Sequence, residues 1–258
     1  MSSVKSEIIQ NRHLEITITR PEKRNALNAE VISEIKSALN KFIDDKTVKS
    51  ITIQSVGDIF CSGADLEMLQ QISKNSHEEN LQDSTRMADL FKLIYTYPKP
   101  VIAKVQGHAI AGGCGLATVC DFVVAVPEAE FSYTEVKIGF IPAIVSWFLI
   151  RKIGEGHARK LLLTGSSIKA DHAEKIGLIS HVIEKEKLNS FVSEFREKLA
   201  VSTSSSSLAL TKSLINEIGG SSIEVGLKKA TELTAFTRST EDCKEGIAAF
   251  LEKRKPKF

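Results

Sequence analysis

The sequence predicts an α/β protein, and two observations carry that prediction. Stretches with the pattern of strands alternate with stretches with the pattern of helices as far as Ile183. A compact unit of strand, glycine-rich turn, helix and strand occupies Pro100–Val126. Such alternation is typical of helices packed on a largely parallel sheet, and not of a β-sandwich or a helix bundle. The chain has 258 residues, 42% of them hydrophobic, which is enough for one full-sized core.

The N-terminal part begins with a strand and a helix. His13–Thr19 alternates apolar and polar residues, the two-residue period of a half-buried strand, and Arg20-Pro21 ends it. Asn28 has the side chain of a helix N-cap. The apolar residues that follow it recur at helical spacing: Val31, Ile32, Ile35, Leu39 and Phe42. A second strand is predicted over Val48–Ile53.

The middle of the chain alternates again. Gln70–Ser84 is polar and shows no clear period, which predicts an exposed excursion without regular structure. A helix is expected over Thr85–Tyr95, because prolines follow it. Within the compact unit, strands are predicted over Pro100–Val105 and Asp121–Val126, with a glycine turn and a short helix between them.

The pattern changes after Ile183, where only helical periodicity remains. Ser202–Ser207 is a run rich in serine, which resists regular structure and suits a hinge. Leu208–Phe250 has the pattern of further helices. We therefore predict a core region over residues 1–200 and a helical region over residues 201–258.

Composition excludes several classes of protein. The net charge is only +2 and no block of basic residues stands out, so nucleic acid is not implied as a partner. The first residues lack the apolar core of a signal peptide, and no stretch approaches the roughly 18 apolar residues of a membrane span. The four cysteines show neither a C-x-x-C pair nor zinc-like spacing. We expect a cytoplasmic protein with reduced thiols, no metal site and no membrane partner.

Two glycine-bearing turns carry the chemistry. The first is Phe60–Leu66, after the second strand, and the other is Ala109–Gly115, at the start of the short helix. Glycines let a backbone approach a ligand closely, and the first N–H groups of a helix lack intrahelical partners. Two such donors aimed at one point would stabilise the negative charge of a thioester enolate. Each turn alone could equally serve tight packing or a phosphate, although the known phosphate fingerprints are absent.

Together, these turns resemble the two oxyanion-hole segments of the crotonase (enoyl-CoA hydratase/isomerase) superfamily. The matching segments are Phe60–Leu66 and Gly107–Ala117, in this order and at this separation. Further matches run along the whole chain: Arg20-Pro21, Asn25–Asn28, Cys120-Asp121, Phe131–Gly139, Ile141-Pro142 and Glu245–Arg254. The resemblance implies a spiral of β-β-α units, followed by a helical C-terminal part that builds homotrimers or hexamers.

The resemblance also implies a substrate and a site. The substrate is an acyl-CoA thioester, and no separate cofactor is needed because coenzyme A is part of it. The backbone N–H groups of Ala64 and Gly112 are implied as oxyanion donors, and Glu135 as the proton carrier. The implied substrate- and CoA-binding residues are Arg24, Ala26, Ser62, Gly63, Ala64, Asp65, Leu66, Gly112 and Lys253. The turn at Arg24 would hold the adenine, and Lys253 would reach the CoA phosphate from a neighbouring subunit.

The departures from the family pattern leave the reaction open. Gly115 stands where hydratases with two glutamates carry the second one. The segment Ile141–Ser146 has no aspartate and resembles hydratases of branched substrates such as methylglutaconyl-CoA. Three readings follow: hydration of a 2-enoyl-CoA, slightly favoured; Δ3-to-Δ2 enoyl-CoA isomerisation by a single glutamate; or a non-catalytic acyl-CoA-binding or interaction protein. Trp147 and Phe148 could line an acyl pocket, although packing is the usual role of such residues.

Overall fold

The strands of this protein form two sheets. The computed structural model describes residues 2–72 and 74–258, without the side chains of Leu66 and Leu69. The strands are β1 (Val4–Ile9), β2 (His13–Ile18), β3 (Ser50–Ser55), β4 (Ile59–Cys61), β5 (Val101–Val105), β6 (His108–Ile110), β7 (Phe122–Ala125), β8 (Glu130–Ser132), β9 (Ile168–Lys169) and β10 (His181–Val182). One sheet has the order β1-β2-β3-β5-β7-β10, and the other the order β4-β6-β8-β9. In the described residues, every pairing but β1–β2 and β8–β9 is parallel, as the predicted α/β class requires.

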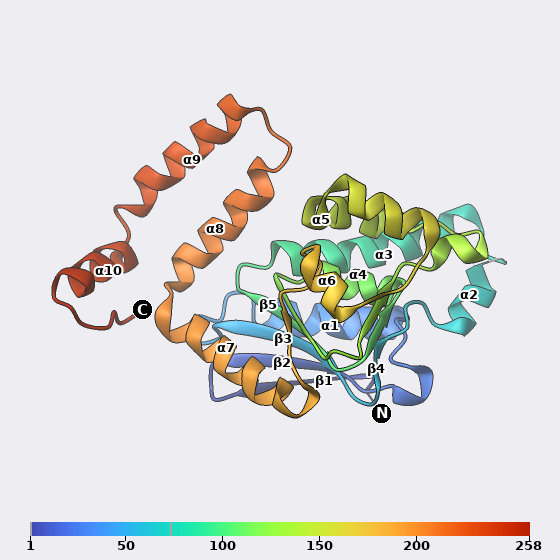
Figure 1. Cartoon of the computed structure of the whole chain (residues 1–258). Coiled ribbons are helices and arrows are strands. Elements are labelled where there is room, and N and C mark those ends of the chain that lie inside the picture. Colours follow the sequence, from blue (N-terminus) through green and yellow to red (C-terminus); the bar gives the residue numbers. More distant parts are fainter. Residues whose placement is uncertain (1, 73) are drawn as a thin grey trace.

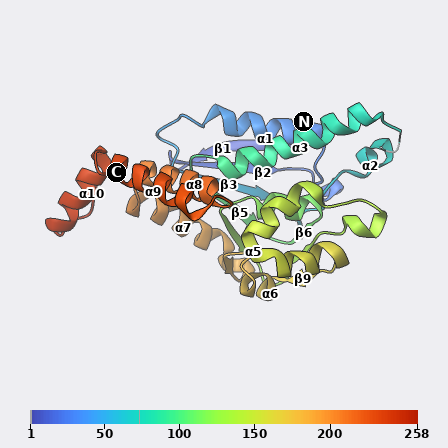
Figure 2. The same cartoon turned by 90° about the horizontal axis from the view of Figure 1, so that it is seen from above.

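Helices cover both faces of the larger sheet (Figures 1 and 2). They are α1 (Ala29–Lys41), α2 (Leu66–Ile72), α3 (His77–Thr96), α4 (Gly112–Thr118), α5 (Ala143–Thr164), α6 (Ala170–Lys175), α7 (Leu188–Ser202), α8 (Ser205–Ile218), α9 (Ile223–Thr237) and α10 (Glu241–Leu251). Three short 3-10 helices are η1 (Pro21–Lys23), η2 (Glu135–Ile138) and η3 (Lys185–Lys187). Figure 2 shows α1 and α3 side by side over one face of the sheet.

The two faces of the larger sheet differ in polarity because side chains alternate along each strand. Leu14 and Ile16 of β2 are fully buried in the apolar core. Between them, Glu15 points the other way and pairs with Arg196 of α7, which is itself buried. The ion pair of Glu15 with Arg196 therefore adds to the apolar contacts between α7 and its face of the sheet.

Several predicted elements are confirmed. The strand predicted over His13–Thr19 is β2, and the one over Asp121–Val126 is β7. Asn28 is the N-cap of α1, where its side chain accepts a hydrogen bond from the Val31 N–H at 2.9 Å. The cap satisfies one of the N–H groups that have no partner within the helix.

The excursion predicted over Gln70–Ser84 is largely exposed, as expected, but the expectation that it lacks regular structure is wrong. Its first residues belong to α2, and α3 begins at His77, well before the predicted start at Thr85. A capping box begins α3: the Glu79 N–H donates to the Ser76 side chain, and the Glu79 carboxylate accepts from the Ser76 N–H. This reciprocal pair has a sequence signature, Ser-x-x-Glu, that outweighs the weak apolar period of the segment.

The predicted serine hinge is also wrong in its extent. Helix α7 runs to Ser202 and α8 begins at Ser205, so only two residues separate them. Ser204 is the N-cap of α8 and accepts a hydrogen bond from the Ser207 N–H at 3.0 Å. Serine here starts a helix instead of preventing one. The division of the chain at residue 200 stays a prediction.

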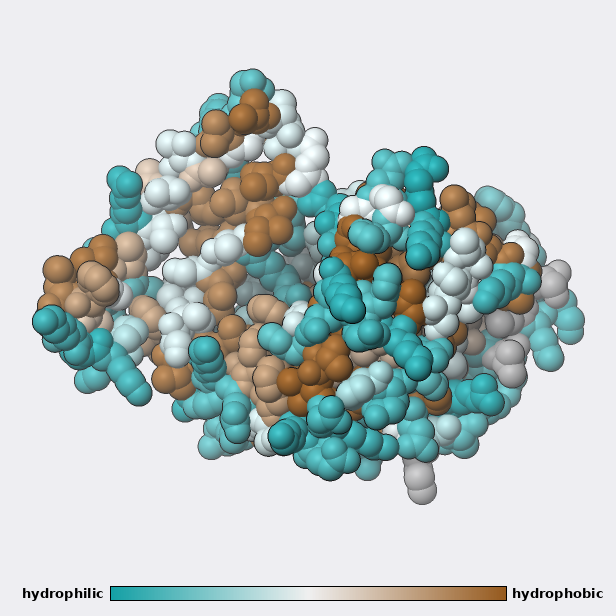
Figure 3. Space-filling model, in the orientation of Figure 1, coloured by the Kyte–Doolittle hydropathy of each residue, from teal (hydrophilic) through white to brown (hydrophobic). Residues whose placement is uncertain are grey.

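Helices α8–α10 form an arm that extends away from the sheets (Figures 1 and 2). Figure 3 shows apolar side chains gathered on α8 and α9. The large apolar side chains exposed on the arm are Ile215, Ile218, Ile223, Val225, Leu227, Phe236, Ile247, Phe250 and Leu251. A search of the described helices for one long and apolar enough to span a bilayer finds none.

Candidate active site

Three neighbouring parallel strands deliver the predicted site residues to one edge of the smaller sheet. Strand β4 pairs with β6 through Cys61 and Ala109, and β6 pairs with β8 through Ile110 and Ser132. Parallel strands end on the same side, so the segments that follow them leave together. Those segments contain Ala64 after β4, Gly112 after β6 and Glu135 after β8. The edge at the carboxyl ends of parallel strands is where such folds bind ligands.

The two glycine turns lie directly against each other. Gly63 has φ +91°, and a Cβ added to it would lie 2.9 Å from the Ala111 Cβ and 3.1 Å from the Gly112 nitrogen. Only glycine fits this position, for reasons of both conformation and space. A Cβ on Gly112 would in turn lie 3.7 Å from the Gly63 Cα. The turns predicted to work as a pair are therefore in contact.

Each turn presents one backbone N–H group for which the described residues provide no acceptor. Ala64 forms a parallel β-bridge with Leu27. In this bridge the Leu27 N–H donates to the Gly63 carbonyl at 2.7 Å, and the Asp65 N–H donates to the Leu27 carbonyl at 3.2 Å. The Ala64 N–H takes no part in these bonds. Gly112 is the first residue of α4, so its N–H has no intrahelical partner. Within residues 2–72 and 74–258, neither N–H has a recorded acceptor.

Glu135 begins η2, three residues after β8 ends. Its side chain is half-buried, and its Oε2 atom has no hydrogen-bond partner in the described part of the chain. Burial raises the pKa of the Glu135 carboxyl above its ordinary value. Burial also raises the pKa of the Cys114 thiol to about 12, with the charge of Glu135 adding to the rise. The carboxyl therefore lies close enough to α4 for its charge to act there.

The position of the absent second glutamate is occupied by apolar side chains. A Cβ on Gly115 would lie 2.8 Å from Cε2 and 2.9 Å from Cζ of Phe91, and 3.4 Å from Cγ2 of Val145. The Phe91 ring in turn packs edge-on against Phe148, with centroids 6.3 Å apart. Phe148 thus contributes to packing behind the site, and Trp147 beside it is half-exposed.

The turn at Arg24 and Ala26, predicted to hold the adenine, has a strained backbone and is fixed by hydrogen bonds. Arg24 and Asn25 have φ of 51° and 53°, in the left-handed region. The Ser62 N–H donates to the Arg24 carbonyl at 3.1 Å, which joins this turn to the first glycine turn. Arg24 itself is exposed, while Ala26 is buried and its carbonyl accepts a hydrogen bond from Arg20. The sequence prediction grouped Arg24, Ala26 and Ser62, and the structure brings them together.

The side chain of Asn25 fixes this turn by hydrogen bonds, and the sequence did not predict that role. Its side chain is buried and donates to the carbonyls of Val56 and Ile59, both at 2.7 Å. It also accepts from the Arg20 N–H at 3.0 Å. An asparagine three residues before a helix cap gives no sequence signal for these long-range bonds. Its tolerance of a left-handed conformation was the available clue.

Asp65 uses its side chain within the protein. The carboxylate forms an ion pair with Arg20 at 2.9 Å and accepts from the Glu67 N–H at 3.1 Å, which caps α2. Burial opposes ionisation, but the hydrogen bonds from Glu67 and Arg20 outweigh it and keep the pKa of Asp65 below its usual value. Asp65 therefore positions the first glycine turn. The backbone of Leu66 begins α2, and its side chain lies outside the described residues.

Lys253 lies far from the other predicted site residues. It follows α10 at the end of the arm and is exposed. In both Figure 1 and Figure 2, α10 and α2 lie at opposite ends of the molecule. A single chain therefore does not bring Lys253 to the site.

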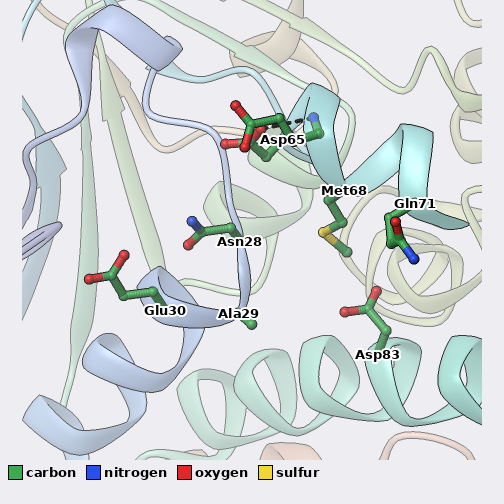
Figure 4. Close-up of a pocket in the computed structure, with 8 residues that line it drawn as sticks. Asn28, Ala29, Glu30, Asp65, Met68, Gln71 and Asp83 are labelled. Carbon is green, nitrogen blue, oxygen red and sulfur yellow. Dashed lines mark hydrogen bonds between the residues drawn. The ribbon is translucent and has the colours of Figure 1, made fainter.

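A pocket of about 340 Å³ adjoins the site on the outer side of Asp65 (Figure 4). Its lining is Asn28, Ala29, Glu30, Asp65, Glu67, Met68, Gln71 and Asp83. Three of its acidic side chains are paired with cations: Asp65 with Arg20, Glu67 with Lys23 and Asp83 with Arg86. Among the described residues, no group of three or more His, Cys, Asp or Glu side chains could hold a metal ion.

Here, parallel strands bring two backbone donors and one carboxyl to the same edge of a sheet. This arrangement is typical of the crotonase class of acyl-CoA enzymes. The enoyl-CoA hydratase/isomerase family model matches residues 9–258, so the chain belongs to that family.

Similar proteins agree with this family. A Thermus thermophilus protein named "Putative enoyl-CoA hydratase" is 39% identical, over 97% of this chain and 99% of that one. The crotonyl-CoA hydratase of Syntrophomonas wolfei is 36% identical, over 93% and 92%. The crystal structure of an enoyl-CoA hydratase from Polaromonas sp. JS666 has a TM-score of 0.93 at 32% identity, covering 98% of each chain.

Proposed function

We propose that this enzyme binds the thioester carbonyl of an acyl-CoA between the N–H groups of Ala64 and Gly112, and moves protons with Glu135. The observation that carries the proposal is the contact of Gly63 with Gly112, at the edge of the sheet where β8 leads into the half-buried Glu135. Two donors at one point stabilise an enolate oxygen, and a single donor of this kind is worth about 10²- to 10³-fold in rate. Neither donor has to leave another partner before it binds the substrate.

The environment of Glu135 suits a proton carrier. A raised pKa brings the carboxyl closer to neutrality, where it can both accept and return a proton. Its unpartnered Oε2 atom is free to face a ligand. The charge that develops on the carbonyl oxygen when Glu135 takes a proton from the α carbon would be held by the two N–H groups.

We favour hydration of a 2-enoyl-CoA, because the similar proteins are named hydratases. Glu135 would hold the water, take its proton as the oxygen attacks the β carbon, and deliver a proton to the α carbon. The segment Ile141–Ser146 favours a branched acyl group of the methylglutaconyl-CoA type. This makes the enzyme a lyase.

The second candidate is Δ3-to-Δ2 isomerisation, and one observation favours it. The Phe91 ring stands where a second acid would be, so position 115 supplies no carboxyl in addition to that of Glu135. An isomerase needs only one, because the proton removed from the α carbon returns to the γ carbon. The third reading, a non-catalytic acyl-CoA binder, predicts that Glu135→Gln changes no acyl-CoA reaction.

Coenzyme A itself would be held by the backbone of the first glycine turn and by the turn at Arg24 and Ala26. The Ser62 N–H joins these two turns through the Arg24 carbonyl, and Gly63 contacts Gly112 of the second glycine turn. We propose that Lys253 comes from a neighbouring copy in a trimer or hexamer, since it lies on the arm. Replacing Lys253 with alanine should then raise KM for the CoA substrate while leaving kcat unchanged.

The two reactions are separated by incubating the protein with a 2-enoyl-CoA and, separately, with a 3-enoyl-CoA. Hydration removes the absorbance of the conjugated thioester and yields a 3-hydroxyacyl-CoA. Isomerisation creates that absorbance from the 3-enoyl substrate. Conversion of the 3-enoyl substrate alone would overturn hydration, and no conversion of either would overturn the proposed activity.

A further inference from the structure

We propose that Phe91 and Gly115 form a coupled pair that limits the site to one acid. The Phe91 ring fills the volume that an acidic side chain at position 115 needs, so this ring is a specificity-determining residue for the type of reaction. The chemical meaning of the pair rests on the proposed function, but its packing does not.

The geometry of α4 places Gly115 beside the oxyanion donor. Gly112 and Gly115 are three residues apart on this helix, which is a little under one turn. A side chain at position 115 would therefore stand next to the carbonyl oxygen held by the Gly112 N–H. The first atom of such a side chain already meets Phe91 at 2.8 Å, a separation that real Cβ atoms essentially never show.

Neighbouring aromatic rings keep Phe91 in place. Phe91 is only 2% exposed and packs edge-on against Phe148. Phe148 in turn contacts the rings of Tyr95 and Trp147, with centroids 5.1 Å and 5.0 Å away. In a close-packed interior the ring cannot swing aside unless these neighbours move as well. Two helices, α3 and α5, thus keep the place of a second acid closed.

The pair also sets the polarity of that wall of the site. Position 115 meets aromatic carbon from Phe91 and aliphatic carbon from Val145. Neither side chain can hold or deprotonate a water molecule. Phe91 and Val145 therefore do not hold the water of the reaction, and the proposal assigns that role to Glu135.

A double-mutant cycle tests the pair, using Gly115→Glu, Phe91→Ala and the two changes combined. Melting temperature, rate of hydration and rate of isomerisation are measured for each protein. We expect Gly115→Glu to lower the melting temperature and to reduce both rates at least tenfold. In the Phe91→Ala background the same change should lower the melting temperature much less. It should also raise the ratio of hydration to isomerisation at least tenfold and add a second ionisation to the pH profile.

Phe122→Ala combined with Gly115→Glu is the matched control. It removes a ring that packs against Phe195, outside the cluster that holds Phe91, and it should not rescue Gly115→Glu. If the charged variants fail to fold, the cycle is repeated with Gly115→Ala and Phe91→Leu, where only the melting temperature is needed. Here too, the change at position 115 should lower it less when Phe91 is replaced.

The proposed coupling would be overturned if the changes in melting temperature were additive. It would also be overturned if a folded double variant had an unchanged ratio of hydration to isomerisation. A wild-type protein that converts neither substrate would overturn the proposed function instead. The melting cycle would still decide whether Phe91 excludes a side chain at position 115.

Discussion

Gly63, which follows β4, lies against Gly112, which follows β6, and a Cβ on Gly63 would lie 3.1 Å from the Gly112 nitrogen. The distance between the Ala64 and Gly112 N–H groups, the proposed oxyanion donors, is therefore set by two glycines from segments far apart in the chain. Any atom added at Gly63 pushes the turns apart. We expect the enzyme to be more sensitive here than at its other glycines with positive φ.

Replacing Gly63 with alanine should reduce kcat/KM by about 10²-fold or more, because the added methyl group displaces one of the two donors. Steady-state kinetics with the preferred enoyl-CoA measures the loss.

Gly154→Ala is the matched control for Gly63→Ala. Gly154 has φ +76° and no atom within 4 Å of an added Cβ, so alanine there is conformationally strained but meets no neighbouring atom. An equal loss in both variants would mean that strain, and not donor spacing, is responsible.

Replacing Glu135 with glutamine should lower kcat by about 10²-fold or more, the usual scale for losing a general acid–base group. The amide keeps the shape of the side chain but cannot take a proton. Glu130→Gln, at the start of β8, should keep nearly full activity, because the Glu130 carboxylate only accepts a hydrogen bond from Ser167. Unchanged kinetics in Glu135→Gln would support the non-catalytic reading.

The raised pKa of Glu135 predicts a pH dependence of stability. The folded protein holds this proton more tightly than the unfolded chain, whose carboxyl has a pKa of about 4.3. Stability should therefore fall as pH rises from that value through the raised pKa. Glu135→Gln should melt at a higher temperature than wild type at neutral pH, and the difference should vanish at acid pH. The opposite sign would show that the carboxylate has a stabilising partner.

The same ionisation should appear in the kinetics. A base must be deprotonated before it can accept a proton, so kcat/KM should rise with pH through the raised pKa of Glu135. Comparing wild type with Glu130→Gln checks the assignment, because the profile should be the same in both.

Replacing Asn25 with alanine should destabilise the protein by about 1–3 kcal/mol, since the Val56 carbonyl and the Arg20 N–H lose their partner and the Ile59 carbonyl loses one of its donors. Chemical denaturation measures the change. Asn11→Ala is the control, because Asn11 is exposed and shares the left-handed conformation with φ 57°. A similar loss in both variants would trace the effect to backbone conformation.

The elements with strong local patterns were predictable from sequence. The strand β2 and the cap at Asn28 were confirmed because period and capping are properties of neighbouring residues. The irregular segment over Gln70–Ser84 was wrong because a weak apolar period was given more weight than the capping signal at Ser76. The early strand β1 was missed, since it carries one buried residue and gains its structure by pairing with β2.

The site was predictable only in part, and for the same physical reason. The two glycine turns and Glu135 stood in ordered motifs, so their residues could be named. What holds them could not be named, because the bonds of Asn25 and the ion pair of Asp65 with Arg20 join segments distant in sequence. The role of Phe91 was invisible for the same reason.

The closed space beside Gly115 limits how this enzyme could evolve. A change of Gly115 to glutamate alone collides with Phe91, while shrinking Phe91 first leaves a cavity that costs about 3–5 kcal/mol. That is a large part of the 5–15 kcal/mol by which domains are typically stable. A lineage could therefore acquire a second acid only after gaining spare stability elsewhere, so the order in which its mutations arise would matter as much as their identity.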